Sequence, residues 1–349
     1  MKKRLISART ALCGILSATI LFSASVSASV EGTVAGFDPE AASAALTAKA
    51  EAEAAAPAAS TEPATEAQSY YYGGPSTVVN GDGTFDLSSL YSHNAVLEKL
   101  DGGEILAAQS SDERIYPASM TKIMTAMLVV ENIPDLDTQI TMSQDVFDLL
   151  NQVEPDASVA GFWPYETVTV RDLLYGILLP SGAECCLQLA AYIAGSSDAF
   201  VDMMNQRAQE LGMNNTHFVT CTGLHNDDHY TTCEDIALLL RTALTYDNFR
   251  IPFCTASYTA PATSQHPEGL TFRSTMFQYM TSSEVTGGQI LGGKTGYTSQ
   301  AGQCLASYAE VNGTQYILVT AGTDGNHQTE QFHILDAQNV YSGIGEIGL

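Results

Sequence analysis

Basic residues are scarce in this chain. It has 349 residues, with 14 Lys and Arg against 39 Asp and Glu, and its formal net charge is −25 at pH 7. Such a balance leaves no basic stripe to neutralise the phosphates of a nucleic acid, so we expect no nucleic-acid partner. It also argues against electrostatic docking on an anionic membrane surface. With 45% hydrophobic residues, the chain can still bury a globular core.

The first 28 residues have the pattern of a secretory signal peptide. An apolar run over 11–22 ends shortly before the small-x-small site Val26-Ser27-Ala28, and it follows a basic start made by Lys2, Lys3, Arg4 and Arg9. We therefore predict cleavage after residue 28 and an extracytoplasmic protein, secreted or associated with the cell wall. An uncleaved anchor is the alternative, because the apolar run is nearly long enough to span a bilayer. Any membrane contact is expected through this uncleaved N-terminus alone.

Residues 29–84 are dominated by Ala, Glu, Ser, Thr and Pro, a composition that cannot bury a core. We predict a disordered linker there and a folded domain over 85–349. Export permits disulfides, but a domain of this size does not need them, so buried free thiols are an equal alternative. The cysteines concerned are Cys185, Cys186, Cys221, Cys233, Cys254 and Cys304.

The folded domain has strand patterns at both ends and helix patterns between them. Strands are predicted over 94–100, 104–109, 289–298, 303–311 and 315–321. Helices are predicted after 119 and over 171–179, 184–194, 198–211, 233–245 and 330–340. This order predicts an α+β fold, in which an antiparallel sheet is flanked by helices and a helical subdomain stands beside it.

Ser119 and Lys122 lie three residues apart, immediately before the apolar run 123–130. Residues with this spacing share a face of a helix, so the lysine amine would stand beside the serine hydroxyl. A helix that is apolar nearly all round should be buried, and desolvation favours a neutral amine. A neutral amine can take the proton of a serine hydroxyl, and the backbone N–H at the helix start can stabilise an oxyanion.

The same motif also occurs as a helix cap followed by a solvated lysine. Lysine usage decides between the two interpretations. Beyond the linker the lysines are Lys99, Lys122 and Lys294. A domain with so few lysines does not place one in an apolar helix for solubility, so we predict that Ser119 is a nucleophile and Lys122 its base.

Two further segments are candidate partners of this pair. Lys294 and Thr295 follow two glycines that let a strand approach another group closely, and they offer a cation and a hydroxyl to a carboxylate. Ser181 lies in a tight turn between two predicted helices. Taken alone, the lysine would be an exposed turn residue and the serine a helix cap.

Together, Ser-x-x-Lys, Ser-Gly-x and Lys-Thr-Gly in this order are close to the signature of penicillin-binding proteins and serine β-lactamases. From about residue 95 to the C-terminus, the chain resembles the low-molecular-mass D-alanyl-D-alanine carboxypeptidases. The segments that carry the resemblance are 114–119, 169–176, 210–218, 223–225, 229–232 and 294–298. The resemblance implies a β-lactamase/transpeptidase-like fold and a serine-type carboxypeptidase.

The resemblance also implies roles for the site residues. Ser119 would form an acyl-enzyme with the penultimate D-Ala of a peptidoglycan stem peptide that ends in D-Ala-D-Ala. Lys122 would be the general base, and Ser181 would relay the proton to the leaving amine. The backbone N–H groups of Ser119 and Tyr297 would form the oxyanion hole. The implied substrate-binding residues are Lys294, Thr295, Gly296 and Tyr297. β-Lactams would acylate Ser119 as covalent inhibitors, and no metal or organic cofactor is implied.

The chain departs from the family pattern at Ala183, where relatives usually carry an asparagine that contacts the lysine base and the substrate carbonyl. Loss of such a hydrogen bond is worth on the order of 2–4 kcal/mol of transition-state stabilisation. A weakly active penicillin-binding or sensor protein is therefore one alternative function. A serine β-lactamase is another, although the segment 216–231 contains no glutamate to activate a deacylating water.

Two further expectations concern a metal and the C-terminus. His225 and His229 flank two aspartates, but no third ligand with suitable spacing stands out, so we predict no metal site. The residues after the closing helix offer neither the small β domain nor the anchoring helix found in many relatives.

Overall fold

The computed structural model describes residues 84–348. The predicted signal peptide over 1–28 and the predicted linker, apart from Thr84, lie outside the described residues. Within residues 84–348, no helix is long and apolar enough to cross a membrane.

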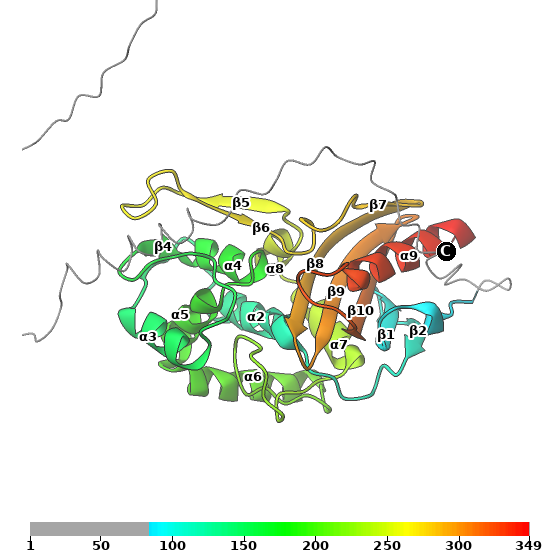
Figure 1. The fold of residues 1–349 in the computed structure, drawn as a ribbon, viewed down its shortest axis with the longest axis horizontal. Coiled ribbons are helices and arrows are strands. Elements are labelled where there is room, and N and C mark those ends of the chain that lie inside the picture. The colour runs from blue at the N-terminus through cyan, green and yellow to red at the C-terminus, as the bar shows by residue number, and fades with distance from the viewer. Residues whose placement is uncertain (1–83, 349) are drawn as a thin grey trace, which may run out of the picture. The chain divides into compact units, whose positions relative to one another are not determined.

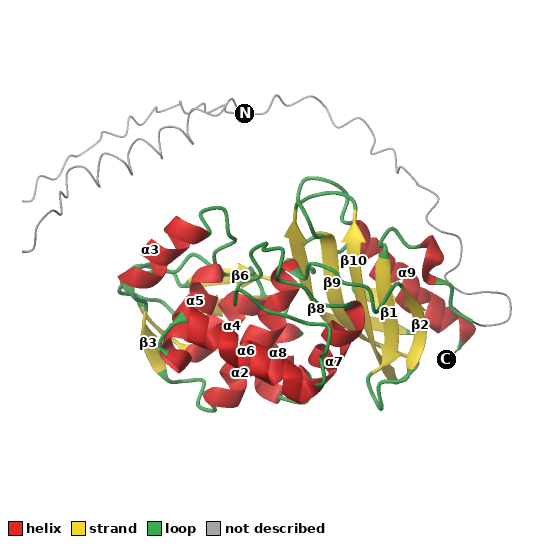
Figure 2. Cartoon of the chain, turned by 90° about the horizontal axis from the view of Figure 1, so that it is seen from below, coloured by secondary structure: helices red, strands yellow, loops and turns green. Residues whose placement is uncertain are grey.

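A six-stranded sheet forms one half of the described fold (Figures 1 and 2). All its neighbouring strands are antiparallel, in the order β2-β1-β10-β9-β8-β7. The strands are β1 (Asn94–Lys99), β2 (Ile105–Gln109), β7 (Glu284–Val285), β8 (Gly288–Thr298), β9 (Gly302–Val311) and β10 (Thr314–Thr323). Strand β1, near the start of the described residues, pairs with β10, the last strand, and Val96 lies opposite Val319. The sheet therefore joins strands from both ends of the domain.

Both faces of this sheet are covered, and alternate side chains serve the two faces. Leu97 and Leu318 pack in a cluster with Ile334 of α9 (Phe332–Ile347). Their neighbours Val96 and Val319 belong to the other, larger cluster, which contains residues of α7 (Cys233–Ala243). In Figure 1, α9 crosses one face of the sheet, while α7 lies at the other. The central strands are thus apolar on both sides.

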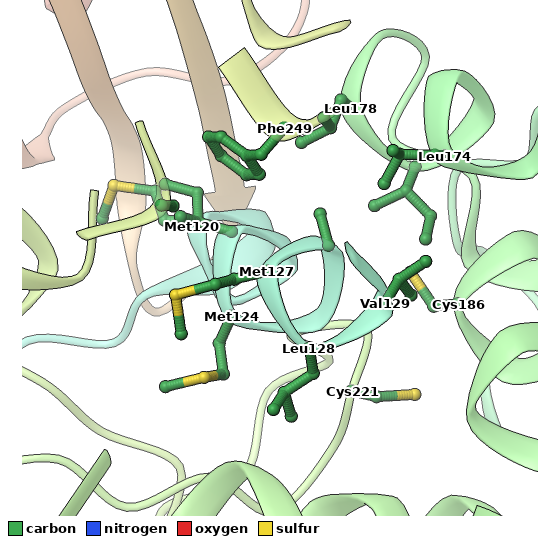
Figure 3. Close-up of a cluster of buried hydrophobic side chains, with 14 of the residues drawn as sticks. Met120, Met124, Met127, Leu128, Val129, Leu174, Leu178, Cys186, Cys221 and Phe249 are labelled. Atoms are coloured by element: carbon green, nitrogen blue, oxygen red, sulfur yellow. The ribbon is translucent and has the colours of Figure 1, made fainter. Parts of the chain in front are cut away.

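The other half of the described fold is a helical group around α2 (Lys122–Asn132). Figure 3 shows Met124, Met127, Leu128 and Val129 of this helix among side chains from α4, α5 and α8. The surrounding helices are α3 (Gln144–Val153), α4 (Val170–Leu178), α5 (Ala183–Ala194), α6 (Ser197–Leu211) and α8 (Asp247–Phe253). Since α2 is buried nearly all round, its first turn is held in a fixed place.

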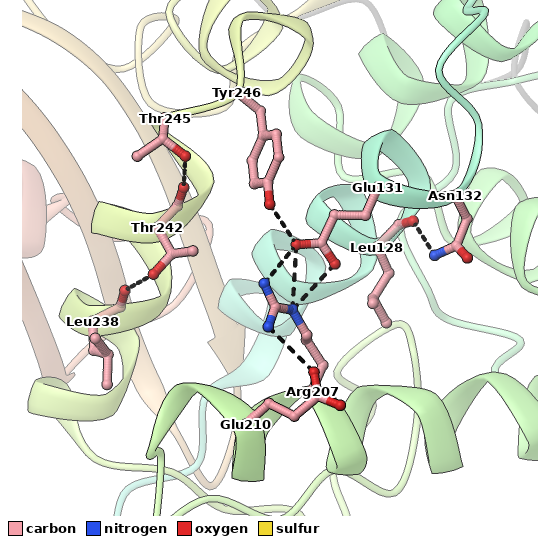
Figure 4. A network of polar contacts seen from close by, with 9 residues as sticks. All are labelled: Leu128, Glu131, Asn132, Arg207, Glu210, Leu238, Thr242, Thr245 and Tyr246. Carbon is pink, nitrogen blue, oxygen red and sulfur yellow. Dashed lines mark hydrogen bonds and ion pairs between the residues drawn. The ribbon is translucent and has the colours of Figure 1, made fainter.

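A polar network fixes the other end of α2 (Figure 4). Glu131 accepts hydrogen bonds from Arg207 of α6, with Nη2 and Oε1 2.8 Å apart, and from the Tyr246 hydroxyl, also at 2.8 Å. A carboxylate that receives an arginine fork and a hydroxyl holds its helix more firmly than a lone surface ion pair does. The helix is therefore anchored both by its apolar faces and by this charged end.

The α+β prediction is confirmed, and every predicted strand and helix of the domain is present. The last helix continues to Ile347, beyond the predicted residue 340, because Tyr341 and Ile344 still face the sheet. Helices α3 and α8, the short strand β7 and two small hairpins were not predicted from the sequence. Those hairpins are β3 (Gln139–Thr141) with β4 (Thr167–Thr169), and β5 (Ser257–Ala260) with β6 (Leu270–Arg273).

Candidate active site

Ser119 and Lys122 form the predicted pair. The Nζ atom of Lys122 donates a hydrogen bond to Oγ of Ser119 at 3.1 Å, and a second to the backbone carbonyl of Thr222 at 2.6 Å. The lysine is 3% exposed. Two oxygen acceptors fix the amine, so it faces the serine hydroxyl with little freedom to turn away.

Ser119 lies in a short 3-10 helix, η2 (Ala118–Thr121), that runs directly into α2. The first N–H groups of such a turn have no acceptor within the helix, so they are available to an anionic group. Ser119 lies at a helix start, as its sequence predicts, although the first turn is a tighter 3-10 turn in place of an α-turn. The hydroxyl and the first-turn N–H groups thus belong to one rigid element.

Strand β8 passes close to η2, and Gly296 makes this approach possible. A Cβ atom at Gly296 would lie 2.9 Å from the carbonyl oxygen of Pro117 and 3.2 Å from the backbone nitrogen of Ser119. These separations are tighter than ordinary van der Waals contact, so a side chain would push the strand away from the serine. The glycine of the Lys-Thr-Gly segment is therefore explained by packing against η2.

Lys294 and Ser181 form a second amine–hydroxyl pair. Nζ of Lys294 donates to Oγ of Ser181 at 3.0 Å and to the backbone carbonyl of Thr295 at 2.9 Å. Burial, together with the charge of Lys122, holds the pKa of Lys294 well below its usual range. Ser181 has φ +69°, in the left-handed region that a residue other than glycine seldom adopts. Both residues are buried, and neither is among the residues that line the two cavities of the site.

Two cavities lie along this part of the structure. The larger, about 390 Å³, is lined by Ser119, Lys122, Thr222 and Tyr297 among others. The smaller, about 220 Å³, is lined by Thr295, Gly296 and Tyr297 among others. Tyr297, Ser158 and His327 line both, and the rings of Tyr297 and His327 meet edge to face at 4.7 Å. The two cavities are therefore adjoining parts of one cleft.

Thr295 is fixed from the side by another hydroxyl. Its Oγ1 lies 2.6 Å from Oγ1 of Thr275, whose backbone N–H donates to the carbonyl of Leu179. The structure thus brings together Ser119, Lys122, Ser181, Lys294, Thr295, Gly296 and Tyr297, all the residues that the sequence analysis singled out.

Ala183 begins α5 and is buried. Its backbone N–H donates to the carbonyl of Ser158 at 2.8 Å. The next residue, Glu184, accepts at Oε1 from the backbone nitrogens of Ala160 at 2.7 Å and Gly161 at 2.8 Å. Burial raises the pKa of this carboxyl group. Glu184 therefore anchors the strip of chain that carries Ser158 into the cleft.

Many residues that line the cleft were not singled out from the sequence, among them Glu154, Ser158, Thr222 and His327. Glu154 caps the C-terminus of α3 and is buried, and its Oε1 accepts a hydrogen bond from the Thr222 hydroxyl at 2.6 Å. The short apolar pattern of α3 gave no sign that its end would reach the nucleophile. Only the three-dimensional fold reveals these four positions.

The two histidines of the candidate metal segment have other roles in the fold. Nδ1 of His229 accepts from the backbone nitrogen of Val219 at 2.9 Å, and its Nε2 lies 2.8 Å from the hydroxyl of Thr121. Burial lowers the pKa of His229 to about 3. Nε2 of His225 lies 3.3 Å from Asp227. Among residues 84–348, no group of three or more His, Cys, Asp or Glu is arranged to hold a metal ion. The six cysteines are free thiols.

An antiparallel sheet packed by helices, with a serine held by a lysine at the start of the central helix, defines a serine acyl-transfer fold of the DD-peptidase and β-lactamase type. Residues 84–325 match the sequence profile of the D-alanyl-D-alanine carboxypeptidase family. The chain belongs to this family.

Named relatives agree with the family. The chain is 32% identical over 250 residues to the D-alanyl-D-alanine carboxypeptidase DacF of Bacillus subtilis, covering 71% of this chain and 62% of that protein. It is 31% identical over 248 residues to DacD of Escherichia coli, covering 69% and 61%. The chain therefore spans about six tenths of the length of these relatives.

Among solved structures, the DD-transpeptidase of Streptomyces K15 is similar, with a TM-score of 0.64 and 27% identity. The match covers 73% of this chain and 97% of that one. A D-alanyl-D-alanine carboxypeptidase from Mycobacterium tuberculosis has the same fold, with a TM-score of 0.64 at 22% identity and a match over 75% of this chain and 93% of that one.

Proposed function

We propose that the protein is a serine-type D-Ala-D-Ala carboxypeptidase that removes the terminal D-Ala of peptidoglycan stem peptides through a Ser119 acyl-enzyme. The observation that carries this proposal is the 3.1 Å hydrogen bond between Nζ of Lys122 and Oγ of Ser119, at the wall of a cleft about 390 Å³ in volume. A buried amine fixed against a hydroxyl, with first-turn N–H groups beside it, supplies a base, a nucleophile and an oxyanion donor in one place.

In the proposed reaction, Lys122 takes the proton of the Ser119 hydroxyl while Oγ attacks the carbonyl carbon of the penultimate D-Ala. The oxyanion is held by the backbone N–H groups of Ser119 and Tyr297. The tetrahedral intermediate collapses when the C–N bond breaks and the leaving amine receives a proton through Ser181. Water then hydrolyses the ester and frees the serine.

Lys294 and Thr295 are proposed to hold the substrate's terminal carboxylate. In the free protein, burial and the nearby Lys122 disfavour the ammonium form of Lys294. A bound carboxylate supplies the missing counter-charge, so substrate binding favours protonation of this lysine. Recognition of a C-terminal carboxylate is thus coupled to the charge of the site.

The substrate class and location follow from the same proposal. The stem peptide that ends in D-Ala-D-Ala is the partner, and β-lactams are covalent inhibitors that acylate Ser119. The signal pattern over 1–28 supports an extracytoplasmic location, where such peptides occur.

Ala183 favours a second candidate, a penicillin-binding sensor with little turnover. The position carries no side-chain amide, and its backbone N–H is used by Ser158. Such a protein would be acylated normally and would hydrolyse its ester slowly.

One paired assay separates these functions. The full chain is incubated with a labelled penicillin and, separately, with a peptide that ends in D-Ala-D-Ala. Lasting label together with released D-Ala supports the carboxypeptidase. Lasting label without release supports the sensor, and rapid loss of label supports a β-lactamase. Absence of label, or label that persists in S119A, rejects the proposed nucleophile.

A further inference from the structure

Glu154 is a carboxylate that the fold brings to the cavity that Ser119 lines. Glu154 lines the same cavity as Ser119 and Lys122, yet only 5% of its surface is exposed to solvent. Burying an ionisable carboxyl group is costly unless the site uses or pairs it. Glu154 thus needs an explanation that the helix end alone does not provide.

The contacts of Glu154 link it to the catalytic lysine. Its Oε1 accepts from the Thr222 hydroxyl at 2.6 Å, and the backbone carbonyl of Thr222 accepts from Nζ of Lys122 at 2.6 Å. One threonine therefore fixes both groups, the carboxylate through its side chain and the amine through its main chain. Glu154, Lys122 and Ser119 all line one cavity.

Other carboxylates near the cleft are engaged differently. Asp156 also lines the cavity but is exposed to solvent. Glu184 receives backbone N–H groups from residues 160 and 161. Among the described residues that line the cavity with Ser119, Glu154 is the buried carboxylate held by a single hydroxyl.

We propose that Glu154 is a catalytic residue of the second half-reaction and activates the water that hydrolyses the Ser119 ester. This inference rests on the proposed acyl-enzyme. The carboxylate of Glu154 takes one proton from water as the water oxygen bonds to the acyl carbon. The ester C–O bond then breaks, and Oγ of Ser119 leaves with the proton that Glu154 took from water. Glu154 returns to its carboxylate form, and the carboxylic acid product releases its own proton to solvent.

The segment 216–231 itself contains no glutamate that could activate a deacylating water. The structure places Thr222 of that segment against a glutamate from α3. The carboxylate and the residue that orients it thus come from segments 68 positions apart.

The test measures acylation and deacylation separately in the full chain. A labelled penicillin gives the acylation rate and the loss of label, and a D-Ala-D-Ala peptide gives turnover. Glu154→Gln keeps the shape and removes the base, so deacylation and turnover should fall by about 100-fold or more while acylation changes less than about threefold. Thr222→Val, which frees the carboxylate but keeps the backbone carbonyl, should slow deacylation by about tenfold.

A competing amine separates a catalytic role of Glu154 from a purely structural one, because only the loss of a base changes how the acyl group divides between amine and water. A neutral amine attacks without a base, whereas water needs one, so in Glu154→Gln the share of acyl groups transferred to an added D-amino acid should rise at least about threefold. The matched control is Glu268→Gln, an exposed glutamate outside both cavities, which should leave all rates unchanged.

Three outcomes overturn the proposal: unchanged deacylation in Glu154→Gln, equal slowing of both steps, or an unchanged share of transfer. If Glu154→Gln does not fold, Thr222→Val decides in the same way. Failure of the proposed function looks different, because the wild-type chain would then take no label at all.

Discussion

Nζ of Lys294 lies 3.0 Å from Oγ of Ser181, although the two residues are 113 positions apart in the chain. The bond joins strand β8 to the turn between α4 and α5, so the sheet and the helical group meet at a serine and a lysine. Lys294 is fully buried, and its pKa is held well below the usual range by burial and by Lys122. Burying an amine in this way costs free energy, and the proposed reaction supplies a reason for it.

Removal of the Ser181 hydroxyl should damage the reaction more than the fold. Ser181→Ala interrupts the proposed proton path and leaves Lys294 without one of its two acceptors. We expect acylation by a labelled penicillin to slow by about 10²–10⁴-fold, the range for a lost acid–base group. Stopped-flow or gel-based labelling measures this rate. Ser264→Ala, at an exposed serine, is the control, and a rate within about threefold of wild type in Ser181→Ala would reject the relay.

The close approach of β8 to η2 predicts a steric defect at Gly296. In Gly296→Ala, the new methyl group meets the Pro117 carbonyl at 2.9 Å and forces the strand away from Ser119. Acylation should fall by at least about tenfold, because small displacements of catalytic groups are costly. Gly102→Ala is the matched control, since a Cβ there meets no atom within 4 Å and the position is strained but remote. Equal labelling rates in the two variants would contradict the packing explanation.

Ala183 offers a test of how much the missing amide matters. Ala183→Asn restores a side chain that can hydrogen-bond a substrate carbonyl, and turnover of a D-Ala-D-Ala peptide should rise about tenfold or more. Steady-state release of D-Ala measures this. Unchanged or lower turnover would mean that the present site, with Ser158 beside it, works without the amide.

Stability at acidic pH should depend on His229. Its pKa is about 3 in the fold against an ordinary value of 6.5, so between these values the unfolded chain binds a proton that the folded chain does not. The free energy of unfolding therefore falls as pH falls through this window, by up to about 1.4 kcal/mol per pH unit from this group. His333, also with a pKa of about 3, acts in the same direction.

His229→Gln removes the pH-dependent contribution of His229 to the free energy of unfolding and leaves that of His333. Urea unfolding between pH 6 and pH 4 should therefore give a shallower loss of stability in the variant than in the wild-type chain. Parallel pH profiles for the two proteins would show that His229 does not stay neutral in the fold.

Much of the fold was predictable because its periodic signals are strong. The long strands around Lys294 and the apolar helix after Ser119 bury residues at regular spacing, and the sequence displays that spacing directly. Helix α8 was not predictable in the same way, since Pro252 lies inside it. Helix α3 buries only Val146 and Leu150, which is too little for a clear pattern.

The residues of the candidate site were likewise predictable only where the signal is local. Ser119 and Lys122 are neighbours on one turn, so their meeting follows from local geometry. Their assembly with Ser181 and Lys294 was inferred from a family resemblance and not from spacing. Glu154 had neither signal, because its place beside Thr222 depends on how α3 packs. The sequence thus predicted contacts between residues on one helical turn, but it did not predict contacts between residues far apart in the chain.

The most direct test of the account is to map the covalent adduct. The full chain is incubated with a labelled penicillin, digested, and analysed by mass spectrometry, beside Ser119→Ala treated identically. If Ser119 is the nucleophile, a single adduct appears on the peptide that contains Ser119 and none appears on the variant. An adduct on another residue, or equal labelling of the Ser119→Ala chain, would contradict it.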